Sequence, residues 1–170
     1  MPTQGVPVIL FAARHRFTCA IPTGGRRLLD VLNDPVSAFL RLRNVEVTWV
    51  RWPSAPIDSL SRCAFRKRAL RVVAITSEAH EAPRGRERSF VSKVRYPVFL
   101  TLPGYEVRGT LHLPRWGDPL QILHSDEGEF FPLTTATLSW GGAGRGSLAA
   151  PVMLVRKAWV DLLAVGERDG

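Results

Sequence analysis

The residues best suited to chemistry in this chain are four histidines and one glycine-rich segment. None of the histidines has a second histidine or a glutamate at the i, i+4 spacing of a helical metal site. The glycine-rich segment at 141–147 offers bare backbone amides, which favour phosphate. However, no lysine follows these glycines, and the apolar run at 151–154 indicates a strand where a nucleotide-binding loop would begin a helix. We therefore interpret 141–147 as a hairpin loop.

One histidine lies near three carboxylates, because Asp126, Glu127 and Glu129 follow His124 closely. These side chains are of the kind that holds a weakly bound cation, but a solvated turn explains the same composition. Ser147 follows a glycine without the full Gly-x-Ser-x-Gly pattern that exposes a hydrolase nucleophile. We accordingly expect no catalytic residue, no metal site and no cofactor, and we rank an enzyme third among the possible functions.

Two tryptophan–arginine pairs carry more information than these motifs. Trp52 follows Arg51, and Trp116 follows Arg115, each at the expected exit of a strand. Tryptophan and arginine dominate the energetic centres of protein interfaces, because one offers a large rigid apolar area and the other several directional donors. The alternative is that both indoles close the ends of a small core.

The positive charge of the chain is concentrated in its first half. Of the formal net charge of +8, residues 1–85 carry 13 basic and 6 acidic side chains, and the remainder carry 10 and 9. Nearly all of the basic residues are arginines, which bind phosphate and carboxylate in a bidentate manner. RNA, an anionic membrane surface and an acidic protein are therefore candidate partners, and a merely solvated basic surface is the alternative. A second set of candidate contact residues is the basic run Arg66, Lys67 and Arg68.

The two halves of the chain resemble one another. Phe39, Val45 and Trp49 align with Phe130, Ala136 and Trp140 at one constant offset, and the dipeptide at 66–67 recurs at 156–157. Several landmarks recurring in the same order predict an internal duplication.

Each half has the pattern of a small β-domain. Phe17, Cys19 and Ile21 alternate with less apolar neighbours, as expected of a half-buried strand, and the leucines of 28–32 have helical spacing. The apolar parity changes between Leu42 and Val45 and again between residues 133 and 136. A parity change at the same place in both halves predicts a β-bulge that bends the strand.

These patterns define the expected domains. We assign residues 14–78 to a first β-barrel, 79–97 to a charged linker and 98–170 to a second β-barrel, each with one short helix. Residues 1–13 lie outside the aligned repeat. Their apolar run is interpreted as an added edge strand or as an arm that lies on a partner through Val8, Leu10 and Phe11.

The string from Pro22 to Asn33, followed by Phe39-Leu40-x-Leu42-x-x-Val45-x-Val47, resembles small uncharacterised bacterial domains. The resemblance implies Sm-like or SH3-like barrels, here in tandem, and no activity. It covers most of the first half well and the second half loosely, since Gln121 and His124 replace the aspartate and asparagine of the motif. The chain is also similar to a small extrinsic subunit of bacterial photosynthetic reaction centre and light-harvesting complexes, although no motif carries this second similarity.

The expected function is therefore that of a non-catalytic scaffold or accessory subunit of a larger, membrane-associated protein assembly, with a photosynthetic complex as one such assembly. RNA binding by an Sm-like protein is the alternative, but the strands lack the spaced surface aromatics on which bases stack. No apolar run approaches the roughly 18 residues of a membrane-spanning helix, and no export signal is recognisable. We expect a cytoplasmic protein, peripheral on the cytoplasmic face of a membrane, whose two cysteines are reduced.

Overall fold

The computed structural model describes residues 5–77, 92–142 and 146–167. The first half contains β1 (Val6–Phe11), β2 (His15–Ile21), α1 (Leu28–Asn33), β3 (Phe39–Trp49), β4 (Pro56–Arg66), the 3-10 turn η1 (Lys67–Ala69) and β5 (Val72–Ile75). The second half contains β6 (Lys93–Leu102), β7 (Tyr105–Pro114), the 3-10 helix η3 (Pro119–Leu123), β8 (Phe130–Trp140), β9 (Gly146–Arg156), the 3-10 turn η4 (Lys157–Trp159) and β10 (Leu162–Val165).

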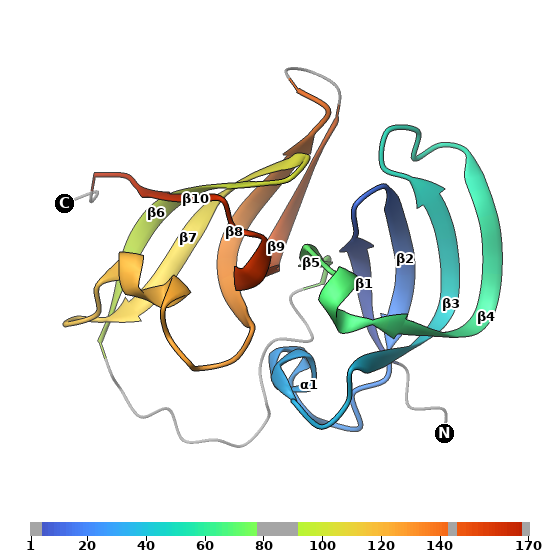
Figure 1. Ribbon diagram of the computed structural model, residues 1–170, viewed down its shortest axis with the longest axis horizontal. Helices are drawn as coiled ribbons and strands as arrows, with labels where there is room; N and C mark the ends of the chain where they lie inside the picture. The colour runs from blue at the N-terminus through green and yellow to red at the C-terminus, as the bar shows by residue number, and fades with distance from the viewer. Residues whose placement is uncertain (1–4, 78–91, 143–145, 168–170) are drawn as a thin grey trace.

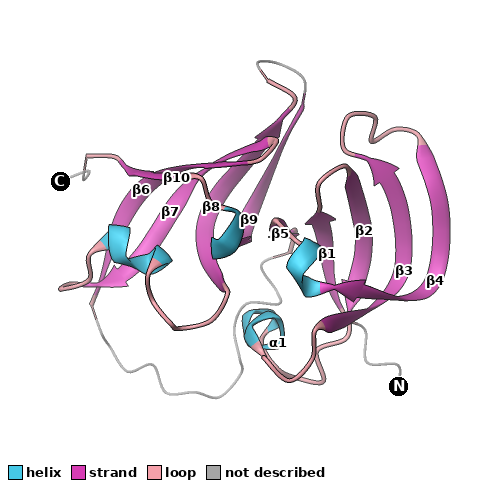
Figure 2. Cartoon of the chain, in the orientation of Figure 1, coloured by secondary structure: helices cyan, strands magenta, loops and turns pink. Residues whose placement is uncertain are grey.

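All ten strands belong to one antiparallel sheet, in the order β10-β6-β7-β8-β9-β5-β1-β2-β3-β4. The expectation of a mainly β protein is thus confirmed. Figures 1 and 2 show the two halves as neighbouring curled parts of this sheet, with α1 below the junction. Among the described strands, the end strands β10 and β4 each pair on one side only, so this sheet is not closed into a barrel.

The two halves repeat the same sequence of elements. Strand β8 begins and ends 91 residues after β3, and β9, η4 and β10 follow β4, η1 and β5 at a separation of 90 residues. Within the sheet, the order β5-β1-β2-β3-β4 of the first half matches β10-β6-β7-β8-β9 of the second. The alignment made on the sequence therefore coincides with equivalent strands in the structure.

The predicted bend in the third strand of each half is confirmed. Asn44 on β3 and Thr135 on β8 have positive φ angles of 50° and 48°. The register between β2 and β3 shifts beside Asn44, and the register between β7 and β8 shifts beside Thr135. One extra residue on the bent strand places Leu42 and Val45 on the same buried face despite their odd spacing.

The helical segments differ between the halves. Helix α1 buries Leu28 and Leu32, as the leucine spacing predicts. In the second half the equivalent segment is the 3-10 helix η3, which begins at Pro119 and is capped by the Asp118 side chain, an acceptor for the Leu120 amide at 3.0 Å. The proline lacks the amide donor of a continuing helix but is well accommodated in a first turn.

Two of the expected boundaries are wrong. Strand β1 is neither an arm nor an edge strand, because it pairs with β2 on one side and with β5 on the other. Its alternation was hidden in the sequence by burial on both faces, which makes the run continuously apolar. Residues 93–97 of the expected linker are part of β6, so the second half begins before residue 98. The rest of that linker, up to residue 91, lies outside the described residues.

The halves are joined through β5, which lies between β1 and β9 in the sheet. Val73 and Ile75 of β5 pack in the core of the first half, whereas Val72 and Ala74 pack in the core of the second. The Asn33 side chain strengthens the junction by accepting from the Phe130 amide at 2.8 Å and donating to the Phe130 carbonyl at 3.2 Å. The two halves consequently share one strand and two interlocked cores.

Candidate binding cleft between the two halves

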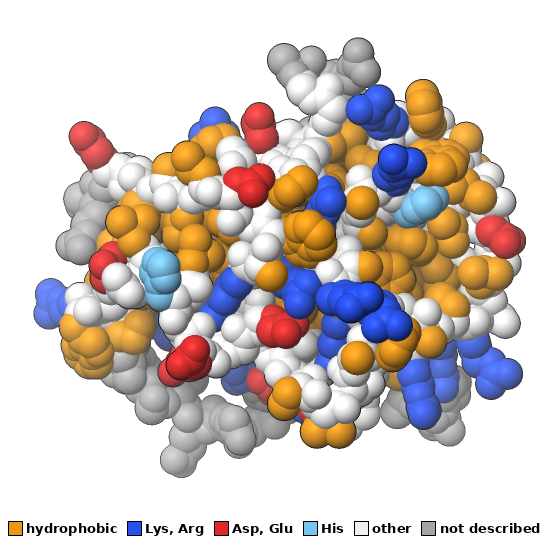
Figure 3. Space-filling model, in the orientation of Figure 1, with side chains coloured by type: hydrophobic (Ala, Val, Ile, Leu, Met, Phe, Trp, Pro, Cys, Tyr) orange, Lys and Arg blue, Asp and Glu red, His pale blue; other side chains and the backbone are white. Residues whose placement is uncertain are grey.

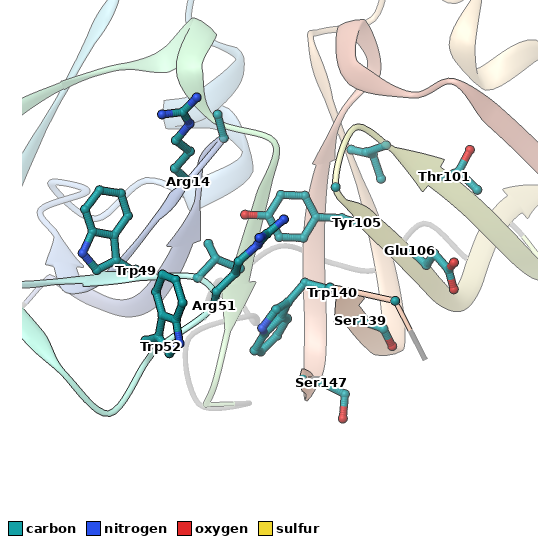
Figure 4. A pocket seen from close by; sticks show the side chains of 17 residues that line it. Arg14, Trp49, Arg51, Trp52, Thr101, Tyr105, Glu106, Ser139, Trp140 and Ser147 are labelled. Carbon is teal, nitrogen blue, oxygen red and sulfur yellow. The ribbon is translucent and has the colours of Figure 1, made fainter. Parts of the chain in front are cut away.

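The β3–β4 loop of the first half faces the ends of the β6–β7 and β8–β9 hairpins of the second, and a cleft of about 1090 Å³ lies between them. Figure 4 shows Arg14, Trp49, Arg51 and Trp52 along one wall. The opposite wall is formed by side chains and glycines of the second half, including Thr101, Tyr105, Glu106, Ser139, Trp140 and Ser147.

The tryptophan wall is held by consecutive turns after β3. The amide of Trp52 donates to the carbonyl of Trp49, and the amide of Ala55 donates to the carbonyl of Trp52, both at 3.2 Å. The amide of Val50 donates to the Arg14 carbonyl at 2.9 Å, which ties this loop to the β1–β2 turn. The ring of His15 stacks on Trp49 with centroids 4.5 Å apart. Trp52 is left 62% exposed, so its indole is presented to solvent from a braced backbone.

The opposite wall is more deeply buried. The Tyr105 hydroxyl donates to the Ala12 carbonyl across the junction at 2.5 Å, and burial raises the pKa of this phenol above its usual range. Trp140 packs against Phe11 of the first half, with ring centroids 5.6 Å apart. A Cβ atom on Gly146 would lie 2.4 Å from the Trp140 indole, so the absence of a side chain at this position leaves room for the ring beside β9.

The charge of the cleft is positive. Arg14 and Arg51 are exposed, and neither forms a hydrogen bond or ion pair with another described side chain. Glu106 is the single acidic residue among those that line the cleft. Such guanidinium groups remain available to an incoming carboxylate or phosphate, and the indoles beside them supply apolar area.

The described part of the chain places no metal-ligating cluster anywhere, since no three His, Cys, Asp or Glu side chains gather there. Of the acidic residues near His124, Glu129 is instead paired with Arg156 at 3.1 Å. The segment at 141–147 connects β8 to β9, which pair up to Trp140 and Gly146, as expected of a hairpin. Residues 143–145 of that loop lie outside the described residues.

The structure separates the two predicted tryptophan–arginine pairs. Arg51 and Trp52 line the cleft, whereas Arg115 and Trp116 lie beyond the end of β7, outside it. Trp116 is 82% exposed, so neither Trp52 nor Trp116 closes a core, and that alternative is excluded. Trp49, at the end of β3, is also exposed.

Three other predicted contact residues are wrong. Val8, Leu10 and Phe11 are almost fully buried on β1, so their side chains are part of the cores and do not reach a partner. The error follows from taking an apolar run for an exposed arm, when two neighbouring strands cover it.

The basic run at 66–68 has three different environments. Lys67 is buried, and its Nζ donates to the carbonyls of Val31 and Asp34 at 2.8 Å each, so it holds the end of α1 and is corrected from a contact residue to a structural one. Burial lowers the pKa of Lys67, and Asp34 opposes that shift. Arg66 lies over the Phe39 ring at 4.5 Å, and Arg68 is exposed beside the junction. Figure 3 shows basic side chains gathered across the centre and lower right of one face.

The residues that sequence reasoning missed are Arg14, Trp49, Tyr105 and Trp140, all at the ends of strands or in the turns that follow them. The repeat alignment did pair Trp49 with Trp140. It contained no signal that these hairpin ends from different halves face one cleft, since that depends on the pairing of β5 with β9.

No helix within the described ranges is long and apolar enough to cross a membrane. Comparison of the chain with protein-family models, with curated proteins and with solved structures finds no match.

Proposed function

We propose that the protein is a non-catalytic docking module that holds a segment of a partner protein in the cleft between its halves. The observation that carries this proposal is the exposed indole of Trp52, braced beside Trp49, Arg14 and Arg51 at the rim of one cleft. A large exposed aromatic side chain next to unpaired guanidinium groups is the composition of an interface hot spot.

The chemistry of the cleft favours an extended segment with acidic side chains and at least one large apolar side chain. Acidic groups would meet Arg14 and Arg51, and the apolar side chain would pack between the indoles of Trp49 and Trp52. The excess of basic residues in the first half would steer such a segment to this wall of the cleft.

We also propose that each half is a variant of one small-barrel domain of the Sm-like or SH3-like type. Support comes from the repeated five-strand order, from the bulge in the third strand and from the single 3-10 turn between the last two strands. On this proposal, strand β5 joins the sheets of two domains that would otherwise have separate edges.

Membership in a larger assembly remains a prediction. A net charge of +8 supports docking on an acidic surface at the cytoplasmic face of a membrane complex, as in a photosynthetic assembly. The docking proposal does not depend on this location, because the cleft is a property of the chain itself.

RNA binding is the second candidate function, and the exposed indoles now favour it more than the sequence did. Single-stranded nucleic acids are held by basic grooves with aromatic rings on which bases stack. Trp52 and Arg51 offer both features within one loop. Glu106 on the opposite wall would repel a phosphate backbone and an acidic segment alike, so this residue does not separate the two candidates.

The decisive experiment compares W52A with W116A in quantitative co-purification from the membrane and soluble fractions of the native organism. Both indoles are exposed, so neither substitution should shift the thermal unfolding midpoint appreciably. We expect W52A to weaken capture of the partner about thirtyfold, which corresponds to about 2 kcal/mol, and W116A to leave it unchanged.

A fluorescent single-stranded oligouridine, titrated in parallel, tests the rival function. Binding that falls steeply with salt and is lost in W52A would establish RNA as the occupant of the cleft. Loss of partner capture in W116A alone would move the docking site to the far end of the second half and overturn the cleft proposal.

A further inference from the structure

Four exposed arginines gather on the outer face of β3 and β4, where the sheet ends in the first half. On β3, Leu42 points into the first core, so the neighbouring positions 41 and 43 point away from it. The pairing of β3 with β4 puts residue 62 opposite residue 43, and residue 66 opposite residue 39, on that same face. In Figure 3, basic side chains project at the lower right, near the place where Figure 1 shows β4. We call this surface the arginine face, and its basic residues are Arg41, Arg43, Arg62 and Arg66.

The charge of the arginine face is not neutralised by the described part of the chain. None of the four guanidinium groups forms a hydrogen bond or an ion pair with a described residue, and that of Arg66 lies over the Phe39 ring at 4.5 Å. Arg43 and Arg62 are directly opposed across the two strands. Like charges at opposed positions destabilise an antiparallel pair. The chain therefore keeps an arrangement that is unfavourable by itself and that an external anion would relieve.

The equivalent face of the second half has the opposite chemistry. Through the constant offsets between the halves, Arg62 on β4 corresponds to Val152 on β9, and Phe39 on β3 corresponds to Phe130 on β8. Val152 and Phe130 are 6% and 2% exposed, because the core of the first half covers them. The same sheet face is thus an apolar contact in one half and a basic, exposed surface in the other. An arginine in place of the valine disfavours a second apolar contact of this kind and favours an anionic occupant.

We propose that the arginine face binds the anionic headgroups of a lipid bilayer. Figure 1 shows β3 and β4 curving around the first half, so this face is the convex side of the sheet. A convex face is suited to a broad surface more than to a segment of chain, which is held in a groove. Guanidinium groups bind phosphate in a bidentate manner, and a bilayer presents many mobile phosphates to neighbouring arginines at once.

Two exposed apolar side chains beside the arginines favour a bilayer over other anionic partners. Val36 is 92% exposed in the turn before β3, and Phe39 is 45% exposed where β3 begins. The turn is braced, because the Asp34 carboxylate accepts from the Val36 amide at 2.9 Å and pairs with Arg26 at 2.8 Å. Basic side chains next to apolar ones are typical of surfaces that lie in the interface of an anionic membrane. RNA would instead need free rings for its bases, and Arg66 already covers one side of Phe39.

The arginine face is separate from the cleft, since none of its four arginines lines that cleft. The inference therefore goes beyond the docking proposal: this face would hold the protein on a membrane while the cleft binds a segment of a partner protein. The W52A variant should accordingly bind vesicles as tightly as wild type. Failure of the cleft proposal and failure of the membrane proposal are thus distinguishable.

Co-sedimentation of the full chain with lipid vesicles tests the membrane proposal. The probes are vesicles of phosphatidylcholine alone and vesicles in which about 30% of the lipid is phosphatidylglycerol. We expect binding to the anionic vesicles that weakens as salt is added, and no binding to the neutral ones. In the R43Q/R62Q variant the binding constant should fall about thirtyfold, which corresponds to about 2 kcal/mol for two arginines at an anionic surface.

The matched control is R95Q/R108Q, which removes the same charge from exposed positions on β6 and β7 of the second half. This variant should bind the vesicles as wild type does, because its arginines lie outside the arginine face. The thermal unfolding midpoint of R43Q/R62Q should equal or exceed that of wild type, because the opposed like charges are removed. Weaker binding by this variant would then not be a consequence of unfolding.

The V36S variant distinguishes a bilayer from an acidic protein. It should weaken binding to the anionic vesicles about fivefold, because an apolar side chain that enters the membrane interface is lost. Retention of V36S on immobilised polyglutamate, which has no apolar interior, should equal that of wild type.

Three results would overturn the membrane proposal. The first is no binding to the anionic vesicles, and the second is equal binding by R43Q/R62Q and wild type. The third is an equal loss of binding in R95Q/R108Q, which would assign the effect to net charge alone. If the vesicles are not bound but polyglutamate or oligouridine is captured through Arg43 and Arg62, the arginine face would belong to an acidic protein or to RNA instead.

Discussion

At the scale of single residues, Cys19 shows how the core acts on an ionisable group. The thiol lies on β2 within the core of the first half, and burial raises its pKa to about 12, with Cys63 adding to the shift. In the unfolded chain the thiol ionises with its ordinary pKa, near 9.0. The folded protein therefore holds a proton that the unfolded chain releases between these two values.

This shift predicts a loss of stability in alkaline solution that depends on Cys19. The contribution is complete below pH 9 and declines as the pH rises from 9 towards 12, because only the unfolded state ionises there. Relative to C19A, the free energy of unfolding of the wild type should be constant between pH 7 and 8.5 and then fall by about 1.4 kcal/mol per pH unit. Urea unfolding of both proteins at several pH values measures this difference in the free energy of unfolding. Parallel curves up to pH 10.5 would contradict the burial of this thiol.

The structural role of two lysines could not be predicted from the sequence. The recurrence of Lys67 as Lys157 was visible in the sequence as part of the repeat, and the basic run at 66–68 predicted a contact role for Lys67. In the structure the Nζ atoms of both lysines donate to two carbonyls of the preceding connection, Lys67 to Val31 and Asp34, and Lys157 to Ser125 and Glu127. A lysine is buried only where acceptors meet its ammonium group, and those acceptors are backbone atoms that no residue pattern reveals.

At the scale of elements, the bulges of β3 and β8 were predictable because they leave a mark in the apolar parity. Asn44 and Thr135 occupy the same position with nearly the same positive φ. Asparagine tolerates this left-handed region, whereas a β-branched threonine is strained in it. The second half therefore contains a local strain that the first half lacks.

Exchanging the two residues tests this difference. We expect T135N to raise the free energy of unfolding by roughly 1 kcal/mol and N44T to lower it by a similar amount, since both side chains are exposed and the backbone term dominates. Chemical denaturation, analysed with one denaturant dependence for all variants, measures these changes in the free energy of unfolding. Two changes of the same sign would show that contacts of the side chains, and not the backbone, decide the stability at these bulges.

At the scale of the whole molecule, the sequence indicated two similar halves but did not indicate that they join into one sheet. Each half was expected to fold as a separate barrel. The apolar face of Val72 and Ala74 gave no sign of which core it enters, because a four-residue strand that is buried on both faces has no alternation. The pairing of β5 with β9 decides this point, and it also creates the cleft.

The shared strand predicts that the halves unfold together, and one matched pair of variants tests it. Ala74 is fully buried in the second core although it belongs to the first half, whereas its equivalent Ala164 is exposed on β10. A74D places a carboxylate among apolar side chains of both halves and should cost about 3–5 kcal/mol. A164D should leave the free energy of unfolding of the dilute chain within about 0.5 kcal/mol of wild type.

Tryptophan fluorescence and circular dichroism, followed during the same denaturation, distinguish one unit from two. The five indoles of the chain are divided between the two halves, so a shared unit requires the fluorescence and the circular dichroism to change at one midpoint in wild type and in A74D. If A74D destabilised one half alone, unfolding would occur in two transitions, and the halves would not be one cooperative unit. Because β5 contributes two side chains to each core, we expect a single transition, shifted as a whole to lower denaturant.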